Sequence, residues 1–160
     1  MKQLTLYHGS NVDFETPSLS KSRNYRDFGK GFYLTTIKKQ AEQWASTLKA
    51  RYGGDGAFLY TFKFDLSDDL QCKAFSGLNG EWLEMIKNNR ITGGVQHAYD
   101  VVMGPVANDD TMPTLALYVD GAISLEATLL ELAYFEANDQ VSLHTDKAMS
   151  KLELSAKEKL

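Results

Sequence analysis

Two short stretches of the sequence combine reactive side chains with glycines. The first, Tyr7-His8-Gly9-Ser10, puts an imidazole, a flexible peptide unit and a hydroxyl in a row at the end of a predicted strand. The second, Gly29-Lys30-Gly31, directly precedes Phe32-Tyr33. Glycine adopts positive φ angles easily and lets the backbone lie close to a ligand. The spacing therefore indicates two places where the chain approaches something closely, at positions typical of binding sites.

Each stretch also has a purely structural interpretation. The glycine pair is compatible with a bulge or a tight turn into a strand, in which Lys30 is simply solvated. His8 alternates with Leu4 and Leu6 on one strand face, so it could be a half-buried histidine at the edge of the core.

Length and composition predict one soluble globular domain with a sizeable core. Cys72 is the sole cysteine in the 160 residues, which excludes an intrachain disulfide framework and suits a reducing, cytoplasmic location. The N-terminus lacks the apolar core of a signal peptide, and no apolar run is long enough for a bilayer, so no membrane partner is expected. Trp44, Trp82 and Cys72 are expected in the core.

The formal net charge of −4 argues against a wide electrostatic footprint for nucleic acid, although it leaves room for a local basic cleft. The most basic window before the tail holds Lys21, Arg23, Arg26 and Lys30. Arg23 and Arg26 could grip a phosphate or could be solvated loop charges.

The elements that must position these residues follow from hydrophobic periodicity. Strands are predicted over 4–8, 31–35, 57–64, 99–106 and 139–145. Helices are predicted over 37–52 and 80–90, in two segments of 112–135, and as a C-terminal helix and tail over about 147–160. Strands and helices lack the regular alternation of a doubly wound sheet, so the fold class is α+β.

Together, the two stretches resemble the ADP-ribosyltransferase superfamily, in the branch of poly(ADP-ribose) polymerases and diphtheria-type toxins. Residues 7–10 are similar to its Tyr-His-Gly-Ser strand, residues 29–34 to its glycine-flanked turn and aromatic strand, and Gln40-Ala41 to a pair in its next helix. The whole chain resembles a bacterial family of that superfamily with no assigned function, often suspected of containing toxins or effectors. The resemblance implies one compact domain over 1–160, with a mixed, antiparallel split β-sheet and flanking helices.

The resemblance further implies an NAD-dependent mono-ADP-ribosyltransferase, which breaks the bond between nicotinamide and ribose and transfers ADP-ribose to a macromolecule. His8 would donate a hydrogen bond to the adenosine-side ribose, and the Gly9 backbone and Ser10 would hold the carboxamide. Tyr33 would stack on the nicotinamide and Gly31 would clear space for it. Such chemistry depends mostly on positioning and electrostatics.

A second aromatic ring would complete the sandwich around nicotinamide, and Tyr25, Phe28 and Tyr118 are the candidates. The resemblance thus assigns NAD binding to Tyr7, His8, Gly9, Ser10, Arg26, Phe28, Gly31, Tyr33 and Gln40, and catalysis to His8, Tyr33 and Gln140.

Gln140 takes the position where many family members carry a catalytic glutamate. A neutral amide can orient a ribose hydroxyl, but it stabilises a developing positive charge less than a carboxylate does. With a shifted alignment, Asp139 or Glu136 would supply that carboxylate.

Three alternatives follow from this difference. The chain could be an NAD glycohydrolase, an inactive module that binds a nucleotide or a partner, or an RNA 2′-phosphotransferase, the last disfavoured by the small number of arginines. The acceptor could be protein, nucleic acid or water, and a cognate neutralising protein is expected for an enzyme of this kind, which could also be delivered to another cell. No metal is expected, because Asp109-Asp110 stand alone and the histidines at 8, 97 and 144 are scattered.

Overall fold

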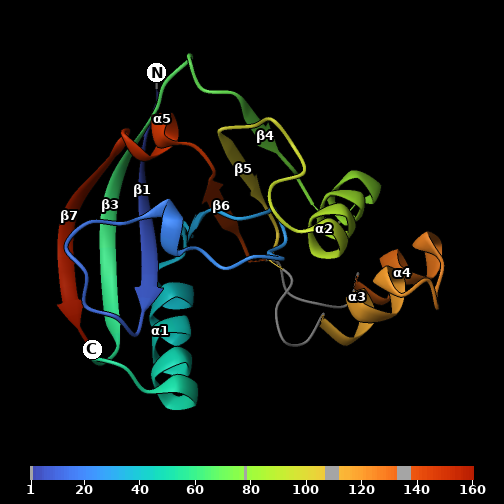
Figure 1. The fold of residues 1–160 in the computed structure, drawn as a ribbon, viewed down its shortest axis with the longest axis horizontal. Coiled ribbons are helices and arrows are strands. Elements are labelled where there is room, and N and C mark those ends of the chain that lie inside the picture. The colour runs from blue at the N-terminus through green and yellow to red at the C-terminus, as the bar shows by residue number, and fades with distance from the viewer. Residues whose placement is uncertain (1, 78, 107–111, 133–137) are drawn as a thin grey trace.

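The first of two β-sheets forms the left side of the computed structural model, which describes residues 2–77, 79–106, 112–132 and 138–160 (Figure 1). Its strands run antiparallel in the order β1 (Lys2–Ser10), β3 (Phe58–Leu66), β7 (Leu152–Lys159). Side chains alternate across a strand, so β3 turns Phe58, Tyr60, Phe62 and Phe64 to one face. That face covers the first core.

The second sheet has the order β2 (Phe32–Leu34), β6 (Gln140–Leu143), β5 (Val101–Gly104), β4 (Cys72–Ala74). Its pairs are antiparallel except β4 with β5. A single bridge joins the sheets: Tyr7 and Thr35 exchange two backbone hydrogen bonds of 2.8 Å. The predicted single α+β domain with mixed and antiparallel sheets is confirmed.

The helices of the described residues flank these sheets. They are α1 (Lys38–Tyr52), α2 (Gly80–Thr92), α3 (Met112–Val119), α4 (Leu125–Leu132) and α5 (Asp146–Met149), with a 3₁₀ turn at Leu19–Lys21. Helix α1 packs against β1 and β3, and α2 lies on the far side of the second sheet, next to α3 and α4 (Figure 1). Within these ranges, no helix is long and apolar enough to cross a membrane.

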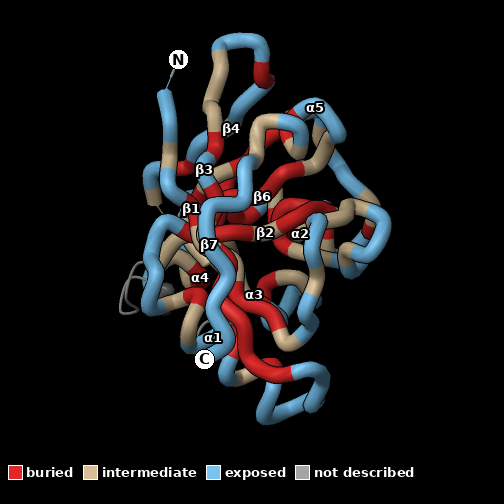
Figure 2. Tube along the Cα trace, turned by 90° about the vertical axis from the view of Figure 1, so that its left-hand side faces the viewer, coloured by how far each residue is buried: buried red, intermediate tan, exposed pale blue. Residues whose placement is uncertain are grey.

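Two hydrophobic clusters form the core. The first fills the space between the sheets, with Phe62 and Phe64 of β3 facing Phe32 of β2 and Leu143 of β6. The second lies between the second sheet and α2, and its centre is Trp82, which is fully buried and donates a hydrogen bond from Nε1 to the Pro105 carbonyl at 3.0 Å. Figure 2 shows the buried segments running through the inner strands.

The prediction of a C-terminal helix was wrong, because only α5 is helical and residues 152–159 form the edge strand β7. Without β7, the backbone groups along one side of β3 would have no strand partner, and satisfying them outweighs the local helical preference of this segment. A bulge lies opposite Thr61, where the Ser155 hydroxyl donates to the Thr61 carbonyl at 3.2 Å. Figure 2 shows β7 almost entirely exposed.

Two further core predictions were wrong. Cys72 is exposed, because β4 is a short edge strand paired on one side with β5. Trp44 is 44% exposed, since α1 buries a narrow stripe of Ala41, Ala45 and Leu48 instead. The small side chains of that stripe allow α1 to approach β1 closely.

Candidate functional site

His8 ties the two glycine-containing stretches together. Its Nδ1 lies 2.6 Å from the backbone carbonyl oxygen of Tyr33, and its ring stacks on Phe32 with centroids 4.4 Å apart. A carbonyl only accepts hydrogen bonds, so Nδ1 carries the proton and Nε2 is an acceptor. Burial lowers the pKa of His8 to about 4, which keeps the ring neutral near pH 7. The expected donor role is therefore reversed: His8 can accept a hydrogen bond from a ligand hydroxyl.

Gly9 and Tyr33 lie next to the bridge that joins the two sheets. The antiparallel bridge pairs Tyr7 with Thr35, so its register, continued by two residues, places Gly9 opposite Tyr33. Pairing stops at that bridge. Because backbone groups alternate along a strand, the N–H and C=O of Gly9 point to the same side as those of Tyr7. This peptide edge can pair with an amide on a ligand.

The side chains of Ser10 and Tyr7 differ in what they can contribute to the site. Ser10 is buried, and its Oγ accepts a hydrogen bond from the Val12 N–H at 3.0 Å, which leaves its own proton for a ligand. Tyr7 projects from the face of β1 opposite to His8, so it contributes to the bridge through its backbone rather than to the site through its ring.

The ring of Tyr33 is held in a fixed orientation. Its hydroxyl donates to the Gly29 carbonyl at 2.6 Å and accepts from the Phe28 N–H at 3.0 Å. Burial raises the pKa of Tyr33. The guanidinium of Arg26 lies over the ring, 3.9 Å from its centroid. A planar cation thus covers the ring where the resemblance expects the cationic nicotinamide to stack.

Arginines gather around the Asp27 carboxylate beside this ring. Arg90 of α2 donates to Asp27 Oδ1, from Nε at 2.8 Å and also from Nη2. Burial lowers the pKa of Arg26, and repulsion from Arg23 and Arg90 lowers it further, while Tyr33 and Asp27 raise it. Several guanidinium groups at one place favour an anion there. Nothing in the sequence pairs Asp27 with Arg90, which lies 63 residues away.

Gln140 is buried at the first position of β6, and its amide is oriented by two acceptors. Its Nε2 donates to the Pro105 carbonyl at 3.1 Å and lies 3.4 Å from Asp27 Oδ2. Gln140 shares its face of the sheet with Ser142, whose backbone partner on β2 is Tyr33. The polar face of β6 therefore lies on the side of Tyr33.

Asp139 is committed to a structural role. Its carboxylate accepts hydrogen bonds from the Thr35 hydroxyl at 2.5 Å, from the Thr36 N–H at 2.9 Å and from the Thr36 hydroxyl. Gln40 of α1 donates from Nε2 to the Asp139 carbonyl at 2.8 Å. Both residues fasten the start of α1 to β6, so neither the alternative carboxylate role of Asp139 nor a direct ligand role of Gln40 is favoured. Glu136, Asp109 and Asp110 lie outside the described residues.

Of the candidate second aromatics, two are part of the core. Phe28 is fully buried beside Phe75, and Tyr118 is buried with its hydroxyl donating to Glu84 at 2.5 Å. Tyr25 is 57% exposed and adopts a φ of 60°, which is rare for a residue with a side chain. Tyr25 is therefore the remaining candidate from that set.

Gly31 is needed for packing rather than for clearing ligand space. A Cβ at this position would lie 2.6 Å from the Leu143 carbonyl oxygen and 2.7 Å from His144 Nδ1. His144 Nδ1 donates to the Lys30 carbonyl at 2.7 Å, and its Nε2 accepts from the Ser142 hydroxyl at 2.7 Å. Both glycines of the turn are thus close to other parts of the chain, since Gly29 also lies against the Gly94–Val95 backbone.

The fold brings two of the three histidines together, which their spacing in the sequence did not predict. The rings of His97 and His144 meet edge to face with centroids 4.5 Å apart. His97 is half-buried and donates from Nε2 to the Phe28 carbonyl at 2.7 Å. Among the described residues, no group of three His, Cys, Asp or Glu side chains could hold a metal ion.

Acidification should destabilise the fold before most carboxylates titrate. Burial lowers the pKa of both His8 and His144 to about 4, whereas an unfolded histidine titrates near about 6.5. Between those values the unfolded chain binds more protons, so the free energy of unfolding falls as the pH falls, by up to about 1.4 kcal/mol per pH unit for each histidine. Urea unfolding across this range measures the slope. His144→Asn should flatten it, and a stability that rises on acidification would contradict the buried neutral rings.

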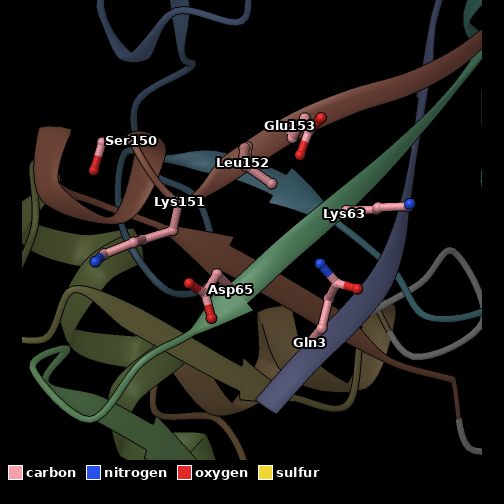
Figure 3. Close-up of a pocket in the computed structure, with 7 residues that line it drawn as sticks. All are labelled: Gln3, Lys63, Asp65, Ser150, Lys151, Leu152 and Glu153. Carbon is pink, nitrogen blue, oxygen red and sulfur yellow. The ribbon is translucent and has the colours of Figure 1, made fainter. Parts of the chain in front are cut away.

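A hollow of about 530 Å³ lies away from these residues, on the outer face of the first sheet (Figure 3). It is lined by Gln3, Lys63, Asp65, Ser150, Lys151, Leu152 and Glu153. Gln3 is five positions from His8 on β1, or about 17 Å along a strand. The hollow is therefore separate from the candidate site.

The fold and site define a class: an α+β domain in which a His-Gly strand end faces a fixed tyrosine ring across the junction of two sheets. The chain belongs to the family described as "Protein of unknown function (DUF3990)", which matches residues 4–154. This agrees with the expected resemblance to a family without an assigned function. No curated protein and no solved structure matches the chain.

Proposed function

We propose that the protein is an NAD-dependent mono-ADP-ribosyltransferase that binds NAD at the opening between the sheets. One observation carries the proposal. The His8 imidazole is bonded to the carbonyl of Tyr33, 25 residues away, while the backbone of Gly9 points into the space opposite Tyr33. The proposal takes the peptide edge of Gly9, the Nε2 acceptor of His8 and the ring of Tyr33 as the groups that bind one ligand. Nicotinamide riboside carries the three matching groups.

In this proposal, the nicotinamide carboxamide pairs with the N–H and C=O of Gly9, and its ring stacks on Tyr33. His8 Nε2 accepts a hydrogen bond from a ribose hydroxyl, the only role its tautomer leaves. These contacts fix the angle between the pyridinium and its ribose while the bond between them breaks. Preorganised positioning of this kind can contribute much of the barrier reduction when the transition state develops little new covalent bonding.

Gln140 would orient the 2′-hydroxyl of the nicotinamide ribose. Its amide is already oriented by Pro105 and Asp27, so little entropy is lost when it binds. A neutral amide stabilises an oxocarbenium ion less than a carboxylate, so we expect slow turnover and transfer of single ADP-ribose units.

Gln140 also favours a second candidate function. Because a buried amide stands where family resemblance expects a carboxylate, the chain could bind NAD without consuming it. Gln140→Glu separates the two candidates: an enzyme limited by charge should release nicotinamide faster in this variant, whereas a binding module should stay inactive. Hydrolysis by water rather than transfer appears in the same assay as free ADP-ribose.

Calorimetric titration of NAD into the full chain, with nicotinamide release followed in the same samples, tests the proposal. We expect saturable binding that Tyr33→Leu weakens by about five- to thirtyfold, through loss of a ring contact of about 1–2 kcal/mol. Tyr52→Ala, at an exposed tyrosine on the far end of α1, is the matched control and should bind normally. Absence of binding to the folded wild-type chain would overturn the assignment of the site.

A further inference from the structure

Basic side chains are concentrated in one segment of an otherwise acidic chain. Residues 19–52 carry eight lysines and arginines but two acidic residues, whereas the rest of the chain carries nine basic and nineteen acidic residues. This segment comprises the loop before β2, β2 itself and α1. The segment is therefore locally basic even though the chain as a whole has a net charge of −4.

The same segment carries the exposed aromatic rings. Among the described residues, the aromatic side chains that are largely exposed are Tyr25 (57%), Trp44 (44%) and Tyr52 (63%). A large aromatic ring left in water loses the stabilisation that burial would give it. A group of such rings on one segment therefore marks a contact surface. Exposed rings and basic side chains therefore occur on the same segment, as expected for a surface that binds a partner.

Two sets of contacts connect this segment with the candidate site, one through Arg26 and one through Gln40. The guanidinium of Arg23 lies over the ring of Tyr52 at 5.5 Å, and Arg26, three residues further on, lies over Tyr33. Gln40 and Trp44 are one helical turn apart on the same face of α1, and Gln40 is bonded to Asp139, the neighbour of Gln140. A ligand that extends from the site along α1 would meet these basic and aromatic groups.

Resting on the proposed function, we propose that this surface binds single-stranded nucleic acid as the acceptor of ADP-ribose. Bases of a single strand stack on exposed aromatic rings, and lysines and arginines contact the phosphates. The bases of a duplex are stacked on one another inside the helix, so they cannot stack on Trp44 or Tyr52.

The transfer step is a substitution at the C1′ carbon of the nicotinamide ribose. An N–H or O–H group of the bound nucleotide forms a new bond to C1′. The C1′–nitrogen bond breaks, and its electron pair leaves with nicotinamide, which becomes neutral. The proton of the nucleophile passes to solvent.

Binding is measured first without NAD, by fluorescence anisotropy of labelled twelve-nucleotide DNA and RNA single strands at two salt concentrations. We expect binding that weakens steeply with salt, quenching of the exposed Trp44, and a loss of about tenfold in affinity in Trp44→Ala and in Tyr52→Ala. Leu117→Ala removes an exposed apolar side chain of α3 and is the matched control. Absent binding, or binding that both aromatic variants leave unchanged, overturns the proposal.

Incubation with NAD labelled in its adenylate part then tests the acceptor role. Label transferred to the strand by wild type, and reduced in Trp44→Ala although nicotinamide release without a strand is unchanged, supports the proposal. Nicotinamide release with label on protein or in free ADP-ribose overturns it and leaves the proposed function standing. Failure of NAD to bind overturns the proposed function and, with it, the acceptor role, while the anisotropy still decides whether the surface binds a strand.

Discussion

Gly9→Ala is expected to destabilise the fold by about 3 kcal/mol, the upper end of what overpacking usually costs. A Cβ at Gly9 would lie 2.1 Å from the carbonyl oxygen of Ala41 and 3.0 Å from the nitrogen of Ala45. Both atoms belong to the backbone of α1, so no side-chain rotation relieves the overlap and the helix itself must move away from β1. For a chain of this length, the melting temperature should fall by roughly 6–12 °C.

Gly77→Ala is the matched control, because a Cβ there meets no atom within 4 Å and its φ is not positive. Thermal unfolding of the two variants side by side measures the difference. Equal stability of Gly9→Ala and wild type would mean that α1 does not approach β1 as described. The expected loss also means that Gly9 serves packing as well as any ligand, so Gly9→Ala cannot test NAD binding by itself.

The pattern of side chains was sufficient to predict most of the elements. Alternation in β3 and helical spacing in α1 and α2 give correct predictions, since each of these elements buries a face that its own sequence marks. Alternation also gives β1 and β6 correctly, although β6 is buried on both faces. β7 was missed because almost all of its side chains are exposed, so its sequence carries no burial pattern. What makes it a strand is the edge of β3, a long-range partner that no local rule contains.

The candidate site also combines features that the local sequence pattern predicts with others that depend on long-range contacts. The two motifs meet at His8 and the backbone of Tyr33, because each lies on a strand that periodicity identifies. The environment of Tyr33 was not predictable. Arg90 reaches Asp27 from α2, and His97 reaches His144 from a loop, through contacts between residues far apart in sequence. The resemblance assigned Gly31 and Gln40 to NAD binding, but in the structure Gly31 packs closely against β6 and Gln40 anchors the start of α1.

Arg26→Ala is expected to shift the affinities of two fragments of NAD in opposite directions. In the ligand-free protein, the Arg26 guanidinium occupies the face of Tyr33 as a planar cation, 3.9 Å from the ring centroid. Nicotinamide must displace it, so removing Arg26 should strengthen nicotinamide binding by about tenfold, the equivalent of a buried cation–π contact of about 1–2 kcal/mol. ADP-ribose has a pyrophosphate but no nicotinamide. If the displaced guanidinium pairs with that pyrophosphate, ADP-ribose should bind about tenfold more weakly.

Calorimetry with nicotinamide and with ADP-ribose measures the two changes in affinity separately, and Arg26→Lys separates the role of the charge from that of the planar group. A lysine keeps the charge for the pyrophosphate but lacks the flat group that covers the ring, so it should restore ADP-ribose binding while keeping the gain for nicotinamide. A weaker affinity of Arg26→Ala for nicotinamide would show that the guanidinium supports the ring instead of competing for it. In that case nicotinamide would have to bind elsewhere than on the covered face of Tyr33.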